Sequence, residues 1–505
     1  MAGSGAHERH IARSTLAQQV AQLYGALAML AVLTLLARTL TLQELGLYGL
    51  LISVSTYVLL LQTSVSGAAV RAIAGAPDAE GRDRVYSAAL AMYVVAGVVA
   101  GVAIALSGIG LAAVLDIPQA LRDDAREAVL ALGVATALGW PAKAFEDGLR
   151  GTQRFSAAAV AQIVAYTAFL AGMVALIELD APLWAVVALG GAVPILIGLA
   201  SGVILLAPGA ALRFRRSLIG RDSVRDLLRV SGYLSSIGLA DVVINTLDRV
   251  ILAAFRSTAT VGLYEGAARP HALVRQLHST LALTVVPVAS GYIAAGDHER
   301  LHDLLLRGTR YVLAIVIPVT VVLMTLSDRI LYVWLGPAFV VAAPAMAILL
   351  SYWLTSASTG VAGGMLVAAG RVRELNRYAW MVAGTNLALS LALTPVLGLE
   401  GVVIGTAVPY VLFLPYLLRL ALDTFSFPLS RLARDAWLPA YTTGALVAAV
   451  AGATRLVAPL DTLPGVMLAV AAALAVGWVA YAVVWMQPYE RRMVRSVLSR
   501  RVTPA

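Results

Sequence analysis

The sequence contains no cysteine, a single lysine and few charged residues, since Asp, Glu, Lys and Arg make up only 13% of its 505 residues. The missing cysteines exclude disulfides, thiolate metal sites and cysteine nucleophiles. The only lysine, Lys143, stands in "WPAKAF", so a Walker A nucleotide-binding loop is excluded as well. Hydrophobic residues make up 60% of the chain, and this composition suits a protein solvated mostly by lipid.

Fourteen apolar stretches, each long enough to cross a bilayer, follow one another along the chain. They lie near residues 15–37, 47–70, 86–107, 126–146, 156–177, 183–206, 230–254, 262–290, 309–327, 343–369, 377–397, 401–419, 436–457 and 464–486. The first is too long for the apolar part of a signal peptide and further spans follow it, so we expect it to be retained. The sequence therefore predicts an all-α, polytopic membrane protein without a sizeable soluble domain.

The basic residues fall almost entirely into every second loop. Of the 37 Lys and Arg, 28 lie in segments that share one side of the membrane with the N-terminus. Because cytoplasmic loops carry the excess of basic residues, this pattern predicts a multi-pass protein of the cell (inner or plasma) membrane with both termini in the cytoplasm. The formal net charge of +9 then reflects topology, and we expect no nucleic-acid partner.

Two parts of the chain echo each other. The triplet Gly-Leu-Tyr at 46–48 recurs at 262–264, an offset of 216, and "GTQRF" at Gly151 is matched by "GRVRE" at Gly370, an offset of 219. An even number of spans per repeat predicts two six-helix lobes in parallel orientation, with substrate bound between them. The predicted parts are an N-terminal lobe (1–215), a C-terminal lobe (216–425), and two additional helices with a cytoplasmic tail (426–505).

Charged side chains inside spans are costly, and they concentrate in the seventh and eighth spans. Helical spacing places Asp241, Asn245 and Asp248 on one face of the seventh span, with Arg249 close by. The eighth span carries two polar stripes, Glu265, Arg269, Gln276 and Thr280 on one and His271, Arg275 and His278 on the other. Glu265 and Arg269 are four residues apart and can pair. Two interpretations stay open, namely a hydrated cavity and structural ion pairs that hold helices together.

One string formally matches a catalytic motif. "HERLH" at His298–His302 has the H-E-x-x-H pattern of zinc metalloproteases, with Glu299 in the second position. It lies in a short predicted inner loop without an evident third ligand or an enclosing domain. We interpret it as a solvated amphipathic turn and expect no metal site there.

Five strings in this order resemble the multidrug/oligosaccharidyl-lipid/polysaccharide exporter superfamily, in particular its polysaccharide (O-antigen, Wzx-type) flippases. They are "LARTLTLQELGLYGLL" after the first span, "GLRGTQRFSAAAVAQI" into the fifth, "NTLDRVILAAFRSTATVGLYEGAARP" across the seventh and eighth, "VVPVASGYIAAGDHERL" after the eighth, and "PVLGLEGVVIGTA" into the twelfth. The resemblance covers nearly the whole chain.

The resemblance implies a flippase that carries an undecaprenyl-diphosphate-linked oligosaccharide across the membrane for polysaccharide biosynthesis, and neither an enzyme nor a cofactor-dependent protein. Its implied partners are the lipid-linked substrate, the bilayer, a polysaccharide polymerase and glycosyltransferases. Arginine holds phosphate oxygens through bidentate bonds, so the candidate substrate-binding residues are Arg38, Arg249, Arg269, Arg275, Asn245 and Gln276. The candidate coupling or charge-pairing residues are Asp241, Asp248 and Glu265.

Three alternatives stay open at this stage. A lipid II (peptidoglycan precursor) flippase of the same superfamily shares the expected number of spans, and a multidrug/cation antiporter shares the lobes. A membrane-embedded glycosyltransferase or polymerase would need long polar outer loops. The longest predicted outer loop, residues 107–125, is short and has few catalytic candidates, which argues against such an enzyme.

Overall fold

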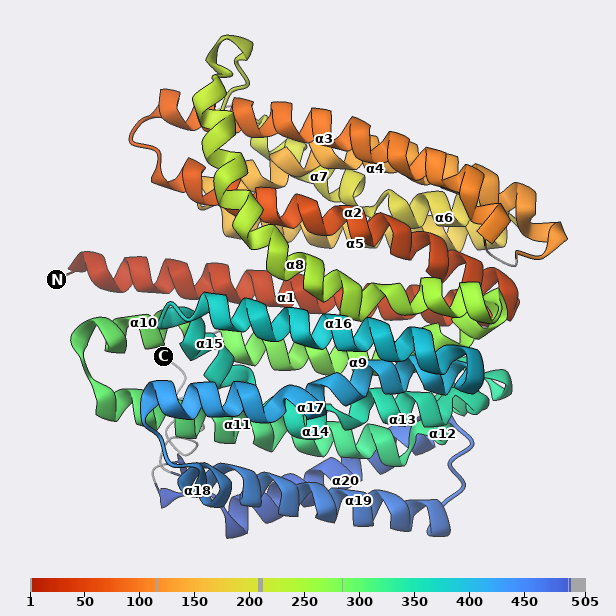
Figure 1. Ribbon diagram of the computed structural model, residues 1–505, viewed down its shortest axis with the longest axis vertical. Coiled ribbons are helices and arrows are strands. Elements are labelled where there is room, and N and C mark those ends of the chain that lie inside the picture. The colour runs from red at the N-terminus through yellow and green to blue at the C-terminus, as the bar shows by residue number, and fades with distance from the viewer. Residues whose placement is uncertain (1, 115–116, 208–211, 284, 489, 492–505) are drawn as a thin grey trace. The chain divides into compact units, whose positions relative to one another are not determined.

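The computed structural model describes the chain except residues 1, 115–116, 208–211, 284, 489 and 492–505, and at some helical positions it describes the backbone alone. In this part of the chain every regular element is a helix (Figure 1). Contacts divide the chain into two compact units. Unit 1 comprises Met1–Glu265 and Ser390–Val402, and unit 2 comprises Gly266–Leu389 and Val403–Ala505. The predicted lobe boundaries stay a prediction, and each unit is treated by itself below.

The α-helices are, in chain order, α1 (Ala2–Thr39), α2 (Leu42–Gly75), α3 (Ala79–Val114), α4 (Arg122–Gly151), α5 (Phe155–Glu178), α6 (Leu183–Gly191), α7 (Val193–Leu205), α8 (Arg221–Phe255), α9 (Thr258–Leu283), α10 (Val285–Ala295), α11 (His298–Thr325), α12 (Ser327–Leu335), α13 (Ala343–Ser351), α14 (Trp353–Ser356), α15 (Gly360–Ala368), α16 (Val372–Leu397), α17 (Leu399–Phe425), α18 (Leu429–Leu432), α19 (Leu438–Val457) and α20 (Leu463–Val484).

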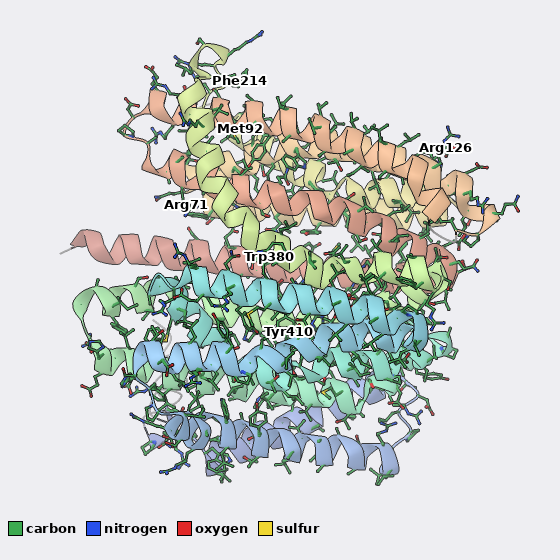
Figure 2. All side chains as sticks on the ribbon, in the orientation of Figure 1. Arg71, Met92, Arg126, Phe214, Trp380 and Tyr410 are labelled. Atoms are coloured by element: carbon green, nitrogen blue, oxygen red, sulfur yellow. The ribbon has the colours of Figure 1, made fainter. Side chains whose placement is uncertain are left out.

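Among the described residues, eleven helical segments are long and apolar enough to cross a membrane, or twelve if α6 and α7, bent by 46°, form one span. The all-α, polytopic fold is therefore confirmed, whereas the exact count of fourteen is not. The helices α2 and α8 cover the second and seventh predicted spans, with 34 and 35 residues, but are not among those segments. Within unit 1, Arg71 of α2 and Arg126 of α4 lie at opposite ends of the helices (Figure 2).

The helix boundaries repeat along the chain at a nearly constant offset. The first helix of each repeat ends at Thr39 (α1) or Phe255 (α8), and the next begins at Leu42 (α2) or Thr258 (α9), each pair 216 residues apart. Further on, α6 and α17 begin 216 residues apart, and α5 and α16 begin 217 apart. These four pairs of helix boundaries support the predicted parallel repeat in addition to the two pairs of sequence strings.

The repeated Gly-Leu-Tyr triplets meet where α2 crosses the start of α9, inside unit 1. A Cβ atom on Gly46 would lie 1.6 Å from the carbonyl oxygen of Thr258, and one on Gly262 would lie 2.3 Å from the carbonyl oxygen of Leu42. The two approaches are equivalent, because Leu42 and Thr258 occupy the same place in the two repeats. Small residues let helix backbones approach closely inside a membrane, so the recurring glycines are explained by this contact.

The last helices, α19 and α20, pack on each other and on α11 of unit 2 (Figure 1). Their shared core consists of Val322, Leu326, Val447, Ala451, Leu460, Val466, Ala469 and Ala473. At one end Arg455 donates to the Asp328 carboxylate at 2.6 Å and to the Thr325 carbonyl at 2.8 Å. At the other end the buried Arg310 pairs with Glu490 at 3.1 Å. Apolar packing and an ion pair at each end thus fix this last part of the chain to the rest of unit 2.

We predict that Gly46→Ala and Gly262→Ala each destabilise the protein strongly. The added methyl group would overlap a backbone oxygen, which cannot rotate away, so the cost should reach or exceed the roughly 1–3 kcal/mol typical of overpacking. Thermal unfolding of the purified protein in detergent measures the effect. The matched control is Gly75→Ala on the same helix, where nothing lies within 4 Å of the added carbon. Unfolding temperatures equal to that control would contradict the close crossing.

Candidate functional site

Four of the polar residues at the α8–α9 turn form one buried cluster in unit 1. The Arg249 guanidinium donates through Nε to Glu265 Oε1 at 2.5 Å, and the Tyr264 hydroxyl donates to Asp248 Oδ2 at 2.7 Å. Asp248 and Glu265 are 1% and 2% exposed, respectively, and the Arg249 guanidinium carbon lies 5.3 Å from the centre of the Tyr264 ring. Helical spacing placed Asp248 and Arg249 close together, and the contact between α8 and α9 adds Glu265 as a partner of Arg249.

Helix α2 closes this cluster from one side. A Cβ atom on Gly49 would lie 2.6 Å from Glu265 Oε1, so only a glycine leaves room for the carboxylate. Gly49 is 216 residues before Glu265 and three residues after Gly46. The same close crossing that brings the repeats together therefore also helps to bury the Glu265 carboxylate.

The structure describes the other predicted residues of this region in less detail. Arg38 is exposed at the last turn of α1, just before the capping box in which Thr41 and Glu44 satisfy each other's backbone N–H groups. The side chains of Asp241 and Asn245 lie outside the described part of the structure.

In unit 2, α9 carries Arg269, Arg275 and Gln276 beside an aromatic cluster. The two arginines are half-buried and Gln276 is exposed. His271 Nε2 and the Tyr352 hydroxyl share a hydrogen bond of 2.6 Å, and the Tyr352 ring stacks on Tyr410 with centroids 4.4 Å apart. Tyr410, from α17, is labelled in Figure 2.

The two histidines of α9 lie against the same tryptophan. The rings of His271 and His278 have centroids 6.0 and 4.9 Å from that of Trp353, so they share one face of α9, as their spacing predicts. A Cβ atom on Gly360 would lie 2.1 Å from His278 Nε2, so α15 begins directly against this side chain. The segment that faces α9 here is divided into three short helices, α13, α14 and α15. Broken helices of this kind line substrate sites in transporters.

The most extensive buried charge network lies on α4, where the sequence analysis placed no site. It consists of Lys143, Glu146, Asp147 and Arg150, named here the α4 tetrad. Lys143 Nζ lies 2.7 Å from Glu146 Oε2 and 3.3 Å from Asp147 Oδ1, and Arg150 lies 2.5 Å from Glu146 Oε1. Glu146 and Asp147 are 6% and 1% exposed, respectively.

Two neighbouring helices donate hydrogen bonds to the tetrad. The Ser66 hydroxyl of α2 donates to Asp147 Oδ1 at 2.6 Å, and the Tyr93 hydroxyl of α3 donates to Asp147 Oδ2 at 2.5 Å. Two cations and two carboxylates balance each other, so the tetrad is neutral overall. Removing or neutralising one member would therefore leave a charge of the tetrad without its counter-charge.

The tetrad could have been recognised in the sequence. Its members are three, four and seven residues apart, which places them on one face of a helix. The fourth span was predicted to end at residue 146, so these charges were read as the inner end of that span. In the structure α4 continues to Gly151, and the charges belong to its buried part.

The HERLH string is helical, and one of its histidines is structural. His298 and Glu299 are exposed in the first turn of α11. His302 is partly buried, lies 2.7 Å from the carbonyl oxygen of Phe425 and packs edge-on against Phe427. The interpretation as a solvated turn is therefore wrong for His302. Within the part of the chain that the structure describes, no group of three or more His, Cys, Asp or Glu could hold a metal ion.

The comparisons with known proteins agree with this architecture. The family model described as "Polysaccharide biosynthesis protein" matches residues 11–293. No curated protein matches the chain.

Several solved structures share the fold. The lipid II flippase MurJ in an inward closed conformation aligns with TM-score 0.70 and 13% identity, over 92% of this chain and 98% of that one. A multidrug resistance MATE family transporter of the MOP superfamily, inward-facing, aligns with TM-score 0.67 and 16% identity over 80% and 94%. A MOP superfamily transporter from Pyrococcus furiosus aligns with TM-score 0.61 and 17% identity over 83% and 95%. At such identities the likeness extends to the fold alone.

We predict that the α4 tetrad behaves as one unit when its members are removed. Lys143→Met or Asp147→Asn alone leaves a buried charge unpaired, which costs about 3–5 kcal/mol, whereas the double variant keeps the charge balance and should lose much less than the sum. Unfolding free energies in detergent, combined as a double-mutant cycle, measure the coupling.

The exposed pair Arg84 and Glu80, at 3.2 Å, is the control for that cycle. Its coupling should stay below about 1 kcal/mol because both side chains are hydrated. Additive losses at Lys143 and Asp147 would mean that the tetrad is not a coupled network.

Proposed function

Because the chain belongs to the polysaccharide biosynthesis protein family, whose model covers residues 11–293, we propose that it is a flippase of a lipid-linked oligosaccharide. The proposed substrate is an undecaprenyl-diphosphate-linked oligosaccharide, carried from the cytoplasmic to the outer leaflet of the cell membrane. Like its neighbours of known structure, it would act as a transporter and not as an enzyme. A polysaccharide polymerase and glycosyltransferases would then act after and before it.

The observation that carries this proposal beyond the family is the pair Arg269 and Arg275. Both lie inside a 38-residue apolar segment, Thr258–Ala295, and both are half-buried. A guanidinium has five N–H donors in a planar fork, so an arginine inside a span can keep a partner within the protein and also hold the oxygens of a diphosphate. We therefore assign these two residues to the diphosphate, with the exposed Gln276 of the same helix as a further polar contact. Arg38 and Asn245, which belong to unit 1, stay predictions from the sequence.

The aromatic cluster of unit 2 supports a saccharide substrate. Tyr352 and Trp353 are buried, whereas Tyr410, which stacks on Tyr352, is partly exposed and is the ring of this cluster that a sugar could reach. Aromatic rings combine apolar faces with polar edges, which suits the mixed surface of a sugar ring. We therefore propose that the arginines bind the phosphates and that the sugars lie near this aromatic cluster.

We assign a charge-pairing role to the α8–α9 cluster. Arg249 is held by Glu265 and by the Tyr264 ring, so releasing it to a substrate would break the buried ion pair with Glu265. Asp248 belongs to the same cluster, and Asp241 is grouped with it by helical spacing.

The membrane potential favours the proposed direction. With both termini in the cytoplasm, as the arginine pattern supports, an anionic headgroup moves toward the positive side. Each charge gains about 2.3 kcal/mol per 100 mV. Two negative charges on a diphosphate would supply enough free energy to bias transport outward without nucleotide hydrolysis.

A lipid II flippase is the second candidate, because the MurJ structure covers 92% of this chain and the MATE structure 80%. Lipid II also presents a polyprenyl diphosphate, so the same arginines would serve. A multidrug antiporter is favoured less, since cationic drugs do not need two arginines inside one span.

We predict that Arg269→Gln and Arg275→Gln each lower polysaccharide export about tenfold or more while membrane insertion stays normal. The expected loss reflects charge-assisted bonds worth about 1.5–3 kcal/mol each. Export is measured as surface polysaccharide in a strain that lacks its own flippase. The control is Arg419→Gln, whose side chain is 86% exposed and 3.9 Å from Asp423. Normal export by both variants would refute the assignment. If the wild-type protein instead rescued a strain that lacks its lipid II flippase, the second candidate would be favoured.

A further inference from the structure

Unit 2 contains a pocket of about 690 Å³ that belongs to none of the clusters above. It lies between the α9–α10 segment and α11, with Val361 of α15 on one wall. Its volume falls in the range of roughly 300–1,000 Å³ that is typical of small-molecule sites. Its composition changes from polar at one end to apolar at the other.

The polar end carries two arginines of α11. Arg300 and Arg307 are seven residues apart, which places them on one face of the helix about 10 Å apart along its axis. Arg300 Nε lies 3.3 Å from Asp297 Oδ2, and Arg307 lies 2.6 Å from Asp303 Oδ2. A guanidinium has five N–H donors in a planar fork, so it can hold a carboxylate and a phosphate oxygen together.

Aromatic residues sit at the same level as the arginines. Tyr292 of α10 lines the pocket, and the Arg300 guanidinium carbon lies 5.8 Å from the centre of its ring. Tyr311 lines the pocket one turn beyond Arg307. Tyrosine beside arginine is typical of the zone where lipid headgroups meet the hydrocarbon core.

The apolar end is lined by aliphatic side chains, namely Leu281, Val285, Val288, Val312 and Val361. From Arg300 to Val312 the helix rises about 18 Å, which is close to the thickness of one hydrocarbon leaflet. The pocket thus combines charged residues at one end with an aliphatic wall whose length is close to the thickness of one leaflet.

We infer that this pocket binds one anionic glycerophospholipid, with its phosphate at Arg300 and Arg307 and one acyl chain along the aliphatic wall. Each arginine pairs with a carboxylate, Asp297 or Asp303, and the five N–H donors of a guanidinium let it hold a phosphodiester oxygen as well. By the arginine pattern, α11 begins on the cytoplasmic side, where anionic lipids are enriched.

A polyprenyl diphosphate shares this chemistry, since it also joins phosphate to hydrocarbon. The aliphatic wall is far shorter than a polyprenyl chain, so it matches a single acyl chain better. The inference is independent of the transported substrate and holds equally for a lipid II flippase.

Native mass spectrometry of the full-length protein tests the inference, with phosphatidylglycerol and phosphatidylcholine as probes. We expect one phosphatidylglycerol to stay bound to the wild type, and Arg300→Gln/Arg307→Gln to weaken its binding about tenfold or more through the lost charge-assisted bonds. Val288→Phe, at an exposed position of the aliphatic wall, should also weaken phosphatidylglycerol binding, because the larger side chain fills part of the pocket. Arg419→Gln should have no effect.

Each competing result has a distinct meaning. Equal retention of phosphatidylcholine would overturn the role of the arginines, and displacement by inorganic phosphate alone would overturn the role of the chain. Displacement by equimolar undecaprenyl diphosphate would make the pocket a substrate site. If the double arginine variant does not fold, lipid selectivity of the wild type and the Val288→Phe result decide the question.

Discussion

A charge inside a lipid-embedded helix must find its counter-charge within the protein, and this constraint organises much of the structure. Water is not available to solvate an unpaired ion there, so removing a partner costs several kcal/mol. The α4 tetrad meets the requirement within one helix, whereas Arg249 and Glu265 meet it across two. Arg310 and Glu490 use the same solution to anchor the end of the chain. Arg269 and Arg275 are proposed to offer further N–H donors of their guanidinium groups to the substrate.

The second constraint is steric and comes from the repeat. Gly46 and Gly262 bring two helix starts into backbone contact, and each glycine faces the carbonyl of the residue that opens the other repeat's helix. The helices α3 and α4 also cross closely at glycines. A Cβ atom on Gly101 would lie 2.4 Å from the carbonyl oxygen of Gly133, and one on Gly133 would lie 2.7 Å from that of Gly101. Close backbone crossings of this kind replace the hydrophobic effect, which does not drive association between helices in lipid. They also leave room for buried charges such as Glu265 beside Gly49.

The sequence predicted the architecture well because its signals are local. Span hydropathy, alternating arginines and the 216-residue repeat each depend on residues that lie near one another in the chain or at a fixed offset, and the all-α fold followed from them. Site chemistry depended on tertiary contacts and was predicted less well. Helical spacing showed that Glu265 can pair with Arg269 on its own helix, whereas its ion pair with Arg249 depends on the contact between α8 and α9. The α4 tetrad was missed because the end of that span was placed five residues early, and His302 acquired a role only through the distant Phe425 carbonyl.

The central claim is that this chain moves a polyprenyl-diphosphate-linked oligosaccharide, driven by its negative charge. Purified protein in liposomes that contain such a lipid on the inner leaflet measures this directly, through the rate at which the saccharide becomes accessible to an external lectin. The account predicts protein-dependent exposure that accelerates when the interior is made negative and slows when the potential is reversed. Exposure at the rate of protein-free liposomes, under either potential, would contradict it.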